Sequence, residues 1–563
     1  MDQGKIWYKG FVNFHLKKYV WVPLAAVAIA LYLKTFHFGF VWDDQITIIR
    51  ILPNFQYLLD VFKPLRMFTL PVNYFRPLSL FSWMIDQTLW GMNPMGYHAT
   101  NVLLHAANVI LVYFLAKRLL TKSGLAAWGA VAAALMFAVH PVQTEVVCWI
   151  AGRPELLFTA FSLLSFILFI QFRSSHQKKW LILAVSSWFL ALLSKETAVS
   201  LLPCLFFYDM LFVENEKRSD IIKSYYWYIV VFLVFLFLRQ RYLINEEVGF
   251  ISGLDITTLF ERVVSAYGFY IQRVIFPVSL CAFIPDYPQT PAVIFASLAI
   301  TASVFAISVL MFRKGKKLPL YLACFFYVTL VPAILVALTN VSDAPVAERY
   351  LYLPLFAASF IIAGIAVVAG PAEKKYIIIP KVCICLTVLL FFGYKTILRI
   401  PVWENSFTFF KMLTVQQPDT GLPYQALGAA YQISGDYLHA IENYNKALSV
   451  QYSEDGRSKV YLNLGVIYID LKKYDAAEKY LQDSLNIKKE GYVYYHMGRL
   501  YYMKAMEEKQ RDKKNEFLAK SKGFLEECLK RSPDYREAER FLKGLEELLK
   551  ADDVLSQKGE ETR

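Results

Sequence analysis

Two adjacent carboxylates, Asp43 and Asp44, follow an apolar run that ends in Phe40-Val41-Trp42. Like charges this close raise the pKa of one carboxyl group, so the pair can hold one proton between them. One carboxylate could then act as a general base towards a hydroxyl group. A solvated loop pair or a helix cap would explain the same residues, and both interpretations stay open at this point.

Basic residues that could bind an anion stand at the ends of other apolar runs. Arg153 opens one run, Lys195 closes another and Arg349 precedes a third. Such a cation could hold a phosphate, helped at Arg153 by the positive end of a helix dipole. The structural alternatives are an ion pair between Arg153 and Glu145, and helix anchoring by Arg349.

Further polar side chains occur at the same ends. His98 shares one helical face with Asn101 and His105, which predicts a polar cavity wall, a metal pair or, most commonly, hydrogen bonds between helices. None of the seven cysteines has a metal-ligand spacing, so small buried side chains are expected. The remaining candidates for a site are His140, Glu145, Glu196, Asp286 and Glu348.

The composition restricts what could position these residues. Of 563 residues, 56% are hydrophobic and only 19% are charged, whereas an ordinary soluble domain is about a quarter charged. This excludes a disordered chain, a coiled-coil rod and a secreted disulfide scaffold. The formal net charge is +13, and the excess base lies in the apolar part, which indicates membrane topology rather than binding of nucleic acid.

Apolar runs of the length that a membrane-spanning helix requires fill the first four hundred residues. The first of them lacks a small-residue cleavage site, so it is not interpreted as a signal peptide. A further run at 260–283 is too short to cross twice and is predicted to be re-entrant or interfacial. The eleven predicted spans are 18–36, 99–119, 124–140, 155–172, 180–195, 197–213, 222–239, 290–312, 318–339, 350–370 and 376–398.

Basic residues predict the orientation, because they mark cytoplasmic loops. The densest group is Arg313, Lys314, Lys316 and Lys317. All basic groups fall on one side if the amino terminus is cytoplasmic and 260–283 does not cross. The carboxyl-terminal part and all the candidate site residues then lie on the opposite, non-cytosolic face. Such a one-sided pocket suits an enzyme acting on a lipid-borne anion better than a channel.

The carboxyl-terminal part contains internal repeats. Leu427-Gly428-x-x-Tyr431 recurs as Leu464-Gly465-x-x-Tyr468 and, more loosely, as Met497-Gly498-x-x-Tyr501. This pattern resembles the tetratricopeptide repeat, a helix-turn-helix unit that stacks into a solenoid with a concave binding face. We expect about three repeats, the third interrupted near 507–516, and a capping helix from Tyr535 to Leu549.

Together these motifs resemble one known family, the transmembrane and tetratricopeptide-repeat-containing O-mannosyltransferases. The resemblance is carried in chain order by Trp42-Asp43-Asp44, Arg76-Pro77-Leu78, Gly96-Tyr97-His98-x-x-Asn101, His140-Pro141-Val142-x-x-Glu145, Gly152-Arg153, Lys195-Glu196 and Glu348-Arg349-Tyr350-Leu351-Tyr352-Leu353-Pro354. It implies an all-α fold in which a polytopic helix bundle precedes the repeat solenoid.

The resemblance also implies an activity. An acidic residue of the first outer loop, Asp43 or Asp44 with Asp43 slightly favoured, would deprotonate a Ser or Thr hydroxyl group. That hydroxyl would attack, with inversion, the anomeric carbon of mannose or another hexose on a polyprenyl phosphate. Arg153, Lys195 and Arg349 would hold the phosphate, and His98, His140, Glu145, Glu196, Asp286 and Glu348 would line the pocket. No cofactor is implied with certainty, and a divalent cation stays open.

The expected organisation is a transmembrane glycosyltransferase domain over 1–402 with a first outer loop at 37–98, repeats over 403–550, and a flexible tail over 551–563. The implied partners are the lipid-linked donor, membrane lipid and an acceptor protein docked by the repeats. The repeats would lie in the periplasm of a bacterial inner membrane, or in the lumen of the endoplasmic reticulum. The alternatives are a transporter or flippase, or a scaffold, with a tetratricopeptide docking domain.

Overall fold

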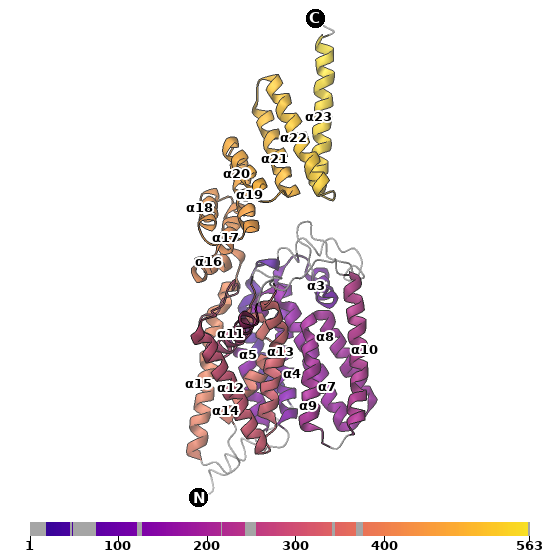
Figure 1. Cartoon of the computed structure of the whole chain (residues 1–563), viewed down its shortest axis with the longest axis vertical. Helices are drawn as coiled ribbons and strands as arrows, with labels where there is room; N and C mark the ends of the chain where they lie inside the picture. The colour runs from indigo at the N-terminus through magenta and orange to yellow at the C-terminus, as the bar shows by residue number, and fades with distance from the viewer. Residues whose placement is uncertain are drawn as a thin grey trace. The chain divides into compact units, whose positions relative to one another are not determined.

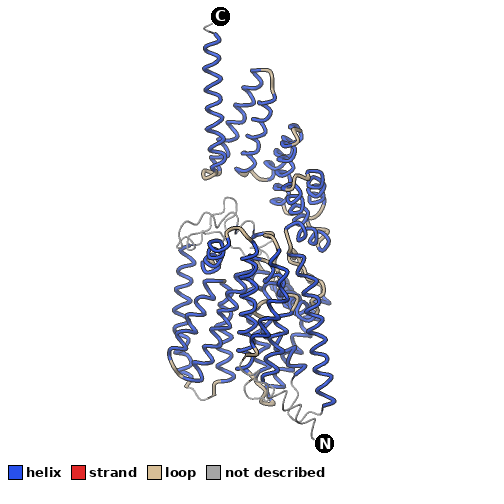
Figure 2. The backbone as a smooth tube through the Cα atoms, turned by 180° about the vertical axis from the view of Figure 1, so that it is seen from behind, coloured by secondary structure: helices blue, strands red, loops and turns tan. Residues whose placement is uncertain are grey.

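The computed structural model describes residues 19–44, 48, 75–120, 126–214, 217–242, 255–339, 344–367 and 375–560. Over these residues the regular structure is helical, apart from isolated bridge residues such as Thr420 and Gln451, and the all-α class is confirmed (Figure 2). The chain divides into two compact units, one ending at Asn405 and the other beginning at Ser406. Each unit is described by itself.

The first unit contains a helix at each of the eleven predicted spans. Its α-helices are α2 (Trp21–Tyr32), α3 (Pro77–Trp90), α4 (Pro94–Leu119), α5 (Ala126–Val139), α6 (Gln143–Cys148), α7 (Arg153–Ser175), α8 (Lys178–Ser194), α9 (Leu201–Phe212), α10 (Arg218–Tyr242), α11 (Ile256–Ile275), α12 (Pro291–Arg313), α13 (Leu318–Ala337), α14 (Leu355–Val367) and α15 (Lys375–Arg399). Its short 3₁₀ helices include η2 (Leu33–His37), η6 (Ile150–Gly152), η7 (Glu196–Ser200), η8 (Glu348–Leu351) and η9 (Ile400–Trp403).

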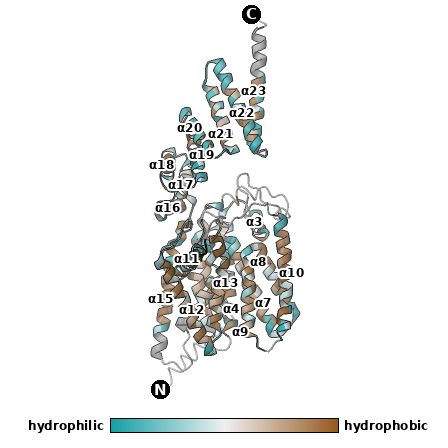
Figure 3. Ribbon diagram, in the orientation of Figure 1, coloured by the Kyte–Doolittle hydropathy of each residue, from teal (hydrophilic) through white to brown (hydrophobic). Residues whose placement is uncertain are grey.

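These helices differ in length. Among the described residues, 6 helices are long and apolar enough to cross a membrane, and three further apolar helices are shorter. The chain is therefore a multi-pass membrane protein by the length and composition of its helices, while the number of eleven spans stays a prediction. Figure 3 shows hydrophobic residues over most of the long helices of this unit.

The long helices have different surroundings. In the apolar stretches of α4 and α7, 56% and 61% of the residues are buried, whereas in those of α12 and α15 only 11% and 17% are buried. The buried helices are joined by polar side chains, as with His105 Nδ1 and Tyr352 Oη at 2.8 Å, and Asn108 Nδ2 donating to the Leu156 carbonyl at 3.0 Å. Such bonds fix helix positions where apolar contact alone cannot discriminate between them.

The two ends of the bundle carry different residues. α4 begins beside Tyr97 and ends with Lys117 and Arg118, and α8 begins with basic residues and ends just before Lys195. In α4 and α8 the candidate site residues thus lie at the helix end opposite the one that carries the basic residues. α11 is amphipathic: Ala266, Phe269 and Tyr270 are buried, while its apolar residues Ile256, Leu259 and Phe260 are exposed. α3 and α11 lie towards the site end of the long helices (Figure 1).

The second unit is built of helix pairs. It comprises α16 (Ser406–Gln416), α17 (Gly421–Ile433), α18 (Tyr437–Ser449), α19 (Glu454–Asp470), α20 (Tyr474–Ile487), α21 (Gly491–Glu507), α22 (Arg511–Arg531) and α23 (Arg536–Glu560). Three pairs, α17/α18, α19/α20 and α21/α22, correspond to the predicted repeats. The terminal helix α23 runs to Glu560, so most of the segment predicted as a flexible tail is helical. Its pattern of Leu548, Leu549 and Leu555 continues the helical spacing past the predicted boundary.

Glycine allows the paired helices to approach closely. A Cβ atom at Gly465 of α19 would stand 2.7 Å from Cγ of Leu481 in α20, closer than carbon atoms pack. The same contact recurs in the first pair, where a Cβ atom at Gly428 would stand 2.8 Å from the Tyr444 ring. Gly523, in the exposed face of α22, would meet nothing within 4 Å.

We predict opposite effects of alanine at two of these glycines. Gly465→Ala should destabilise the second repeat by about 1–3 kcal/mol through overpacking. Gly523→Ala should stabilise its helix by about 0.5–1 kcal/mol, because it only removes backbone freedom. Hydrogen exchange of α19, α20 and α22 amides in the full chain measures both. Equal protection of α19 in Gly465→Ala and the unsubstituted chain would contradict the close approach.

Candidate active site

A chain of charged side chains joins four segments at one end of the first unit. Arg349 of η8 donates from Nη1 to Glu145 Oε1 at 2.8 Å, and its backbone N–H donates to Glu145 Oε2 at 3.0 Å. Its Nε lies 4.0 Å from Oε1 of Glu155. The same oxygen accepts from Nζ of Lys195 at 2.5 Å. Two cations and two carboxylates therefore alternate across α6, α7, the end of α8 and η8.

Local sequence places these groups at helix ends. Pro154 occupies the first turn of α7, where its missing N–H costs nothing, and starts this helix directly after η6. Lys195 has an extended backbone between α8 and η7, which turns its side chain inward. The ring of Tyr350 stacks under two cations, with Lys195 Nζ at 4.7 Å and the Arg349 guanidinium at 5.2 Å from its centroid.

Asp43 and Asp44 have different environments. Asp44 is fully buried, and its two oxygens accept from the backbone N–H groups of Val41 at 3.0 Å and Ala151 at 2.7 Å. Asp43 is partly exposed, and no hydrogen bond or ion pair joins it to any residue that the structure describes. Asp44 thus fastens the loop to η6, while the carboxylate of Asp43 stays available.

Burial changes the protonation of both carboxyl groups. Burial raises the pKa of Asp43 from 3.8, and the positive charge of Arg349 partly opposes this. Burial raises the pKa of Asp44 to about 8, against the lowering effect of the backbone N–H donors. Glu145 behaves in the same way: burial raises its pKa to about 7 although Arg349 lowers it. Asp43 is the only one of the three with an exposed portion.

Three tryptophans connect the loop to the end of the unit. Trp42 stacks on Trp149 with ring centroids 5.2 Å apart, and Trp149 stacks on Trp403 at 6.2 Å. The Arg349 guanidinium lies 5.6 Å from the centroid of Trp149. Trp42 has a φ of 53°, a left-handed conformation that is uncommon for a large side chain. The stack therefore holds the residue before Asp43 in a strained backbone.

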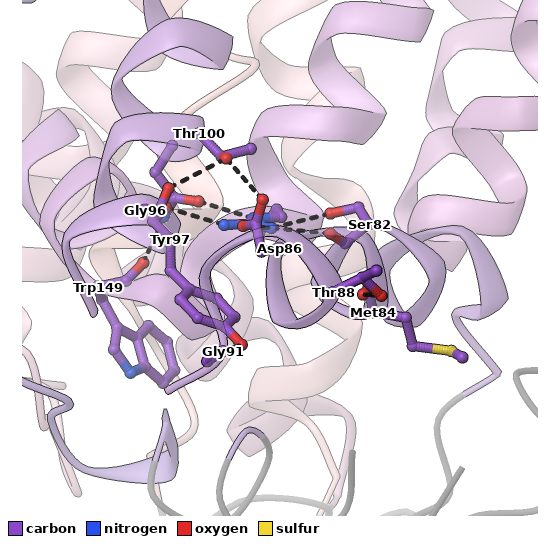
Figure 4. A network of polar contacts seen from close by, with 11 residues as sticks. Ser82, Met84, Asp86, Thr88, Gly91, Gly96, Tyr97, Thr100 and Trp149 are labelled. Carbon is purple, nitrogen blue, oxygen red and sulfur yellow. Dashed lines mark hydrogen bonds and ion pairs between the residues drawn. The ribbon is translucent and has the colours of Figure 1, made fainter. Parts of the chain in front are cut away.

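Arg153 is enclosed by protein groups. Its side chain is fully buried, and its partners are Asp86 Oδ2 (2.5 Å), Asn101 Oδ1 (2.8 Å), Tyr97 O (2.9 Å), Ser82 Oγ (3.1 Å) and Ser82 O (3.3 Å). Figure 4 shows the network around Asp86, which also accepts from Thr100 at 2.8 Å. Through these contacts Arg153 joins α3, α4 and α7, and its buried side chain is enclosed by groups of the described residues.

Glu196 and Glu348 pair with other arginines. Glu196 accepts from Arg76 Nε at 3.0 Å and from Arg76 Nη2 at 2.5 Å. Burial alone would raise the pKa of Glu196, but Arg76 outweighs it and the pKa falls to about 2. Glu348 is buried between Arg273 and Arg399. Each glutamate borders the charged chain, because it is adjacent in sequence to Lys195 or Arg349.

Three predicted pocket residues lie outside these contacts. His98 Nε2 is 3.4 Å from the Gly39 carbonyl, and His140 Nε2 is 3.0 Å from the Val274 carbonyl. This contact joins the end of α5 to α11. Asp286 is exposed and accepts from the backbone N–H of Tyr287. Within the described residues none of the three bonds to the charged chain, because residue type and position near a helix end do not set side-chain direction.

Sequence reasoning missed four residues of the site. No role was predicted for Glu155, Asp86, Arg273 or Arg399. The available signal was that each is an ionisable residue in or beside an apolar run, where an unpaired charge is costly. In the described part of the chain, no group of three or more His, Cys, Asp or Glu side chains is arranged to hold a metal ion.

The fold and the site together define a multi-pass helical membrane unit with a one-ended charged site, followed by a helical repeat unit. Residues 79–240 match the family model described as dolichyl-phosphate-mannose-protein mannosyltransferase, and residues 419–490 match that of the tetratricopeptide repeat. The predicted resemblance to the transmembrane and tetratricopeptide-repeat-containing O-mannosyltransferases is thereby confirmed.

Curated relatives carry the same description. Protein O-mannosyl-transferase Tmtc1 of Drosophila melanogaster is 33% identical over 206 residues, which cover 35% of this chain and 23% of that protein. Protein O-mannosyl-transferase TMTC2 of Mus musculus is 32% identical over 224 residues, covering 36% and 25%. The chain thus spans about a quarter of the length of these relatives. An Archaeoglobus fulgidus oligosaccharyltransferase structure aligns with a TM-score of 0.43 at 13% identity, covering 73% of this chain and 59% of that one.

We predict that Arg153 is needed for folding. Arg153→Gln should leave Asp86 buried without its cation and cost about 3–5 kcal/mol. The double variant Arg153→Gln with Asp86→Asn should recover part of that loss, because the buried charge is removed with its partner. Thermal unfolding of the purified chain in detergent measures all three. A double variant no more stable than Arg153→Gln would show that the charge pair is not the cause.

Proposed function

We propose that this chain is a membrane-embedded protein O-glycosyltransferase that transfers mannose, or another hexose, from a polyprenyl-phosphate sugar to Ser or Thr side chains. The observation that carries the proposal is Asp43, a partly exposed carboxylate with a raised pKa and no bonding partner among the described residues. It lies beside a buried chain of ion pairs. The mannosyltransferase match over residues 79–240 supports the same reaction class.

Asp43 acts as the general base. It accepts the proton of the acceptor hydroxyl as that oxygen forms a bond to the anomeric carbon. The bond from this carbon to the phosphate oxygen breaks, its electron pair stays on the phosphate, and the configuration inverts. A raised pKa brings a carboxylate closer to the operating pH and makes it a more effective base. Asp44 cannot do this while both its oxygens accept from backbone N–H groups.

The predicted phosphate-binding residues divide into two kinds. Arg349 is 15% exposed and acts electrostatically on Asp43, while its own charge is matched by that of Glu145. Lys195 is 3% exposed and held by Glu155. Its ammonium group pairs with Glu155, and the Glu155 oxygen that it contacts also lies 4.0 Å from Nε of Arg349. Arg153 supports the wall through Asn101 and does not bind phosphate in this proposal.

We place the repeats on the same side of the membrane as the site, and propose that they dock the acceptor protein there. Trp403, which belongs to the tryptophan stack, stands two residues before the end of the first unit, and the carbonyl of Glu404 accepts from Gly39 N at 2.9 Å. The chain therefore leaves the first unit at its site end. This compartment would be the periplasm, or the lumen of the endoplasmic reticulum.

Asp43→Asn should abolish transfer while leaving the fold intact. Loss of a general base lowers the rate roughly 10²–10⁴-fold, and Asp43 forms no hydrogen bond or ion pair with the described residues that the substitution would remove. Hexose transfer from a polyprenyl-phosphate sugar to a Ser/Thr peptide, followed by mass spectrometry, measures the rate. Asp286→Asn is the matched control: it also removes a carboxylate, at an exposed position outside the charged chain. Full activity of Asp43→Asn would exclude Asp43 as the base.

The pH profile should show the raised pKa. Asp43 accepts a proton only when ionised, and burial favours its protonated form. The rate should therefore fall, as the pH is lowered, through an apparent pKa above the usual 3.8 of aspartate. The dependence of kcat on pH under saturating donor measures this limb. An acid limb at or below pH 4 would contradict the desolvation of Asp43.

A further inference from the structure

A second charged cluster surrounds Glu348, the first residue of η8. Glu348 is fully buried, and its Oε1 accepts from the backbone N–H of Cys281 at 2.9 Å. Arg273 of α11 places Nε 3.5 Å from Oε1, and Arg399 of α15 places Nη1 2.6 Å from Oε2. Two arginines from different helices therefore share one carboxylate, at the end of the unit that carries the candidate active site.

The net charge of the cluster around Arg349 differs from that of the cluster around Glu348. Arg349 and Lys195 are matched by Glu145 and Glu155, and Asp43 adds a further carboxylate nearby. That cluster is neutral to negative, so it repels rather than attracts a phosphate. Among the described residues, Glu348 is the carboxylate within ion-pair distance of Arg273 and Arg399, so this group of three has one positive charge in excess. The two arginine side chains are 14% and 11% exposed, so little water screens this charge.

Hydrogen bonding at the two arginines is also incomplete. Nε of Arg273 and Nη1 of Arg399 are buried. Each lies within ion-pair distance of Glu348, but neither is aligned for a hydrogen bond with the described residues. An anion with several oxygens would satisfy both guanidinium groups and cancel the remaining charge. Guanidinium groups are suited to phosphate because they present N–H donors in a planar fork.

The surroundings of Arg273 suit a lipid. The residues after the helix, Phe276 and Val278, are 66% and 56% exposed, and Phe260 on the same helix is 50% exposed. An amphipathic helix with such an apolar edge lies at a membrane interface. The two arginines would thus lie beside a surface that contacts hydrocarbon, as a phosphate carried on a long isoprenoid chain requires.

We propose that Arg273 and Arg399 bind the phosphate of the lipid-linked sugar donor, with Glu348 holding their guanidinium groups at a fixed separation. This inference rests on the proposed function. A phosphodiester donor carries one negative charge, which matches the single excess positive charge. When the bond from the anomeric carbon breaks, the phosphate gains a second negative charge, and two guanidinium groups stabilise it. Glu348 and Arg349 are consecutive, so η8 directs one side chain to the phosphate cluster and the next towards the base.

Binding of a polyprenyl phosphate without a sugar, in lipid nanodiscs containing the full-length chain, tests the site separately from transfer. Arg273→Gln and Arg399→Gln should each weaken binding at least tenfold. Arg262→Gln, the matched control on the same helix, should change it less than about twofold, because a charge-assisted contact contributes roughly 1.5–3 kcal/mol and a remote one does not. Affinity unchanged in both Arg273→Gln and Arg399→Gln would overturn the proposal.

Two further measurements cover other outcomes. A photoreactive polyprenyl phosphate should label peptides of α11 or the end of α15 in the unsubstituted chain. This needs no variant to fold, and labelling confined to other helices would overturn the site.

Excess phosphatidylglycerol or inorganic phosphate should not displace the probe. Displacement at equal affinity would make the site a general phosphate site and overturn the donor assignment. Hexose transfer by the same preparations separates this inference from the proposed function. If the variants bind the probe and transfer hexose as the unsubstituted chain does, the phosphate-site inference is refuted and the proposed function is not.

Discussion

The structure depends on the cost of leaving a charge unpaired inside an apolar bundle. In a low-dielectric interior an isolated ionised side chain is strongly disfavoured, so each one must find a partner of opposite charge. Here the partners come from helices distant in sequence, as Asp86 does for Arg153 and Glu155 for Lys195. Each pair therefore fixes the relative position of two helices where packing of Leu, Val and Phe would allow several. The pairs that position the site are the same pairs that specify the fold around it.

Short irregular elements carry the functional groups because they break the helical hydrogen-bond pattern. η6 leaves the N–H of Ala151 free to donate to Asp44, and η8 directs Glu348 and Arg349 to different clusters. Gly152 makes the close turn of η6 practicable, since a Cβ there would stand 2.7 Å from the Val146 carbonyl oxygen. The helix bundle is the rigid scaffold, and the short turns determine where the functional side chains point.

Much of the architecture could be predicted from hydropathy and repeat spacing. Long apolar runs specify helices directly, and Gly465 and Leu464 specify a repeat because close helix packing needs a small residue at fixed spacing. The site was predicted only as a population of ionisable residues at helix ends. Which of them converge depends on side-chain direction and on partners far away in sequence. Hence Arg153 was expected to bind phosphate but is enclosed by Asp86 and Asn101, and Arg399 was overlooked at the end of a predicted span.

The same electrostatic constraint separates the two halves of the proposed reaction. A base must sit where positive charge is limited, since strong positive potential would hold its carboxylate too weakly basic. A leaving phosphate must sit where positive charge is in excess. Two consecutive residues of η8 provide these two environments. The charge of Arg349, near the base, is compensated by Glu145, whereas Arg273 and Arg399 share the single carboxylate of Glu348. The phosphate leaves as an anion and needs no proton, so stabilising cations take the place that a general acid has in other glycosyl transfers.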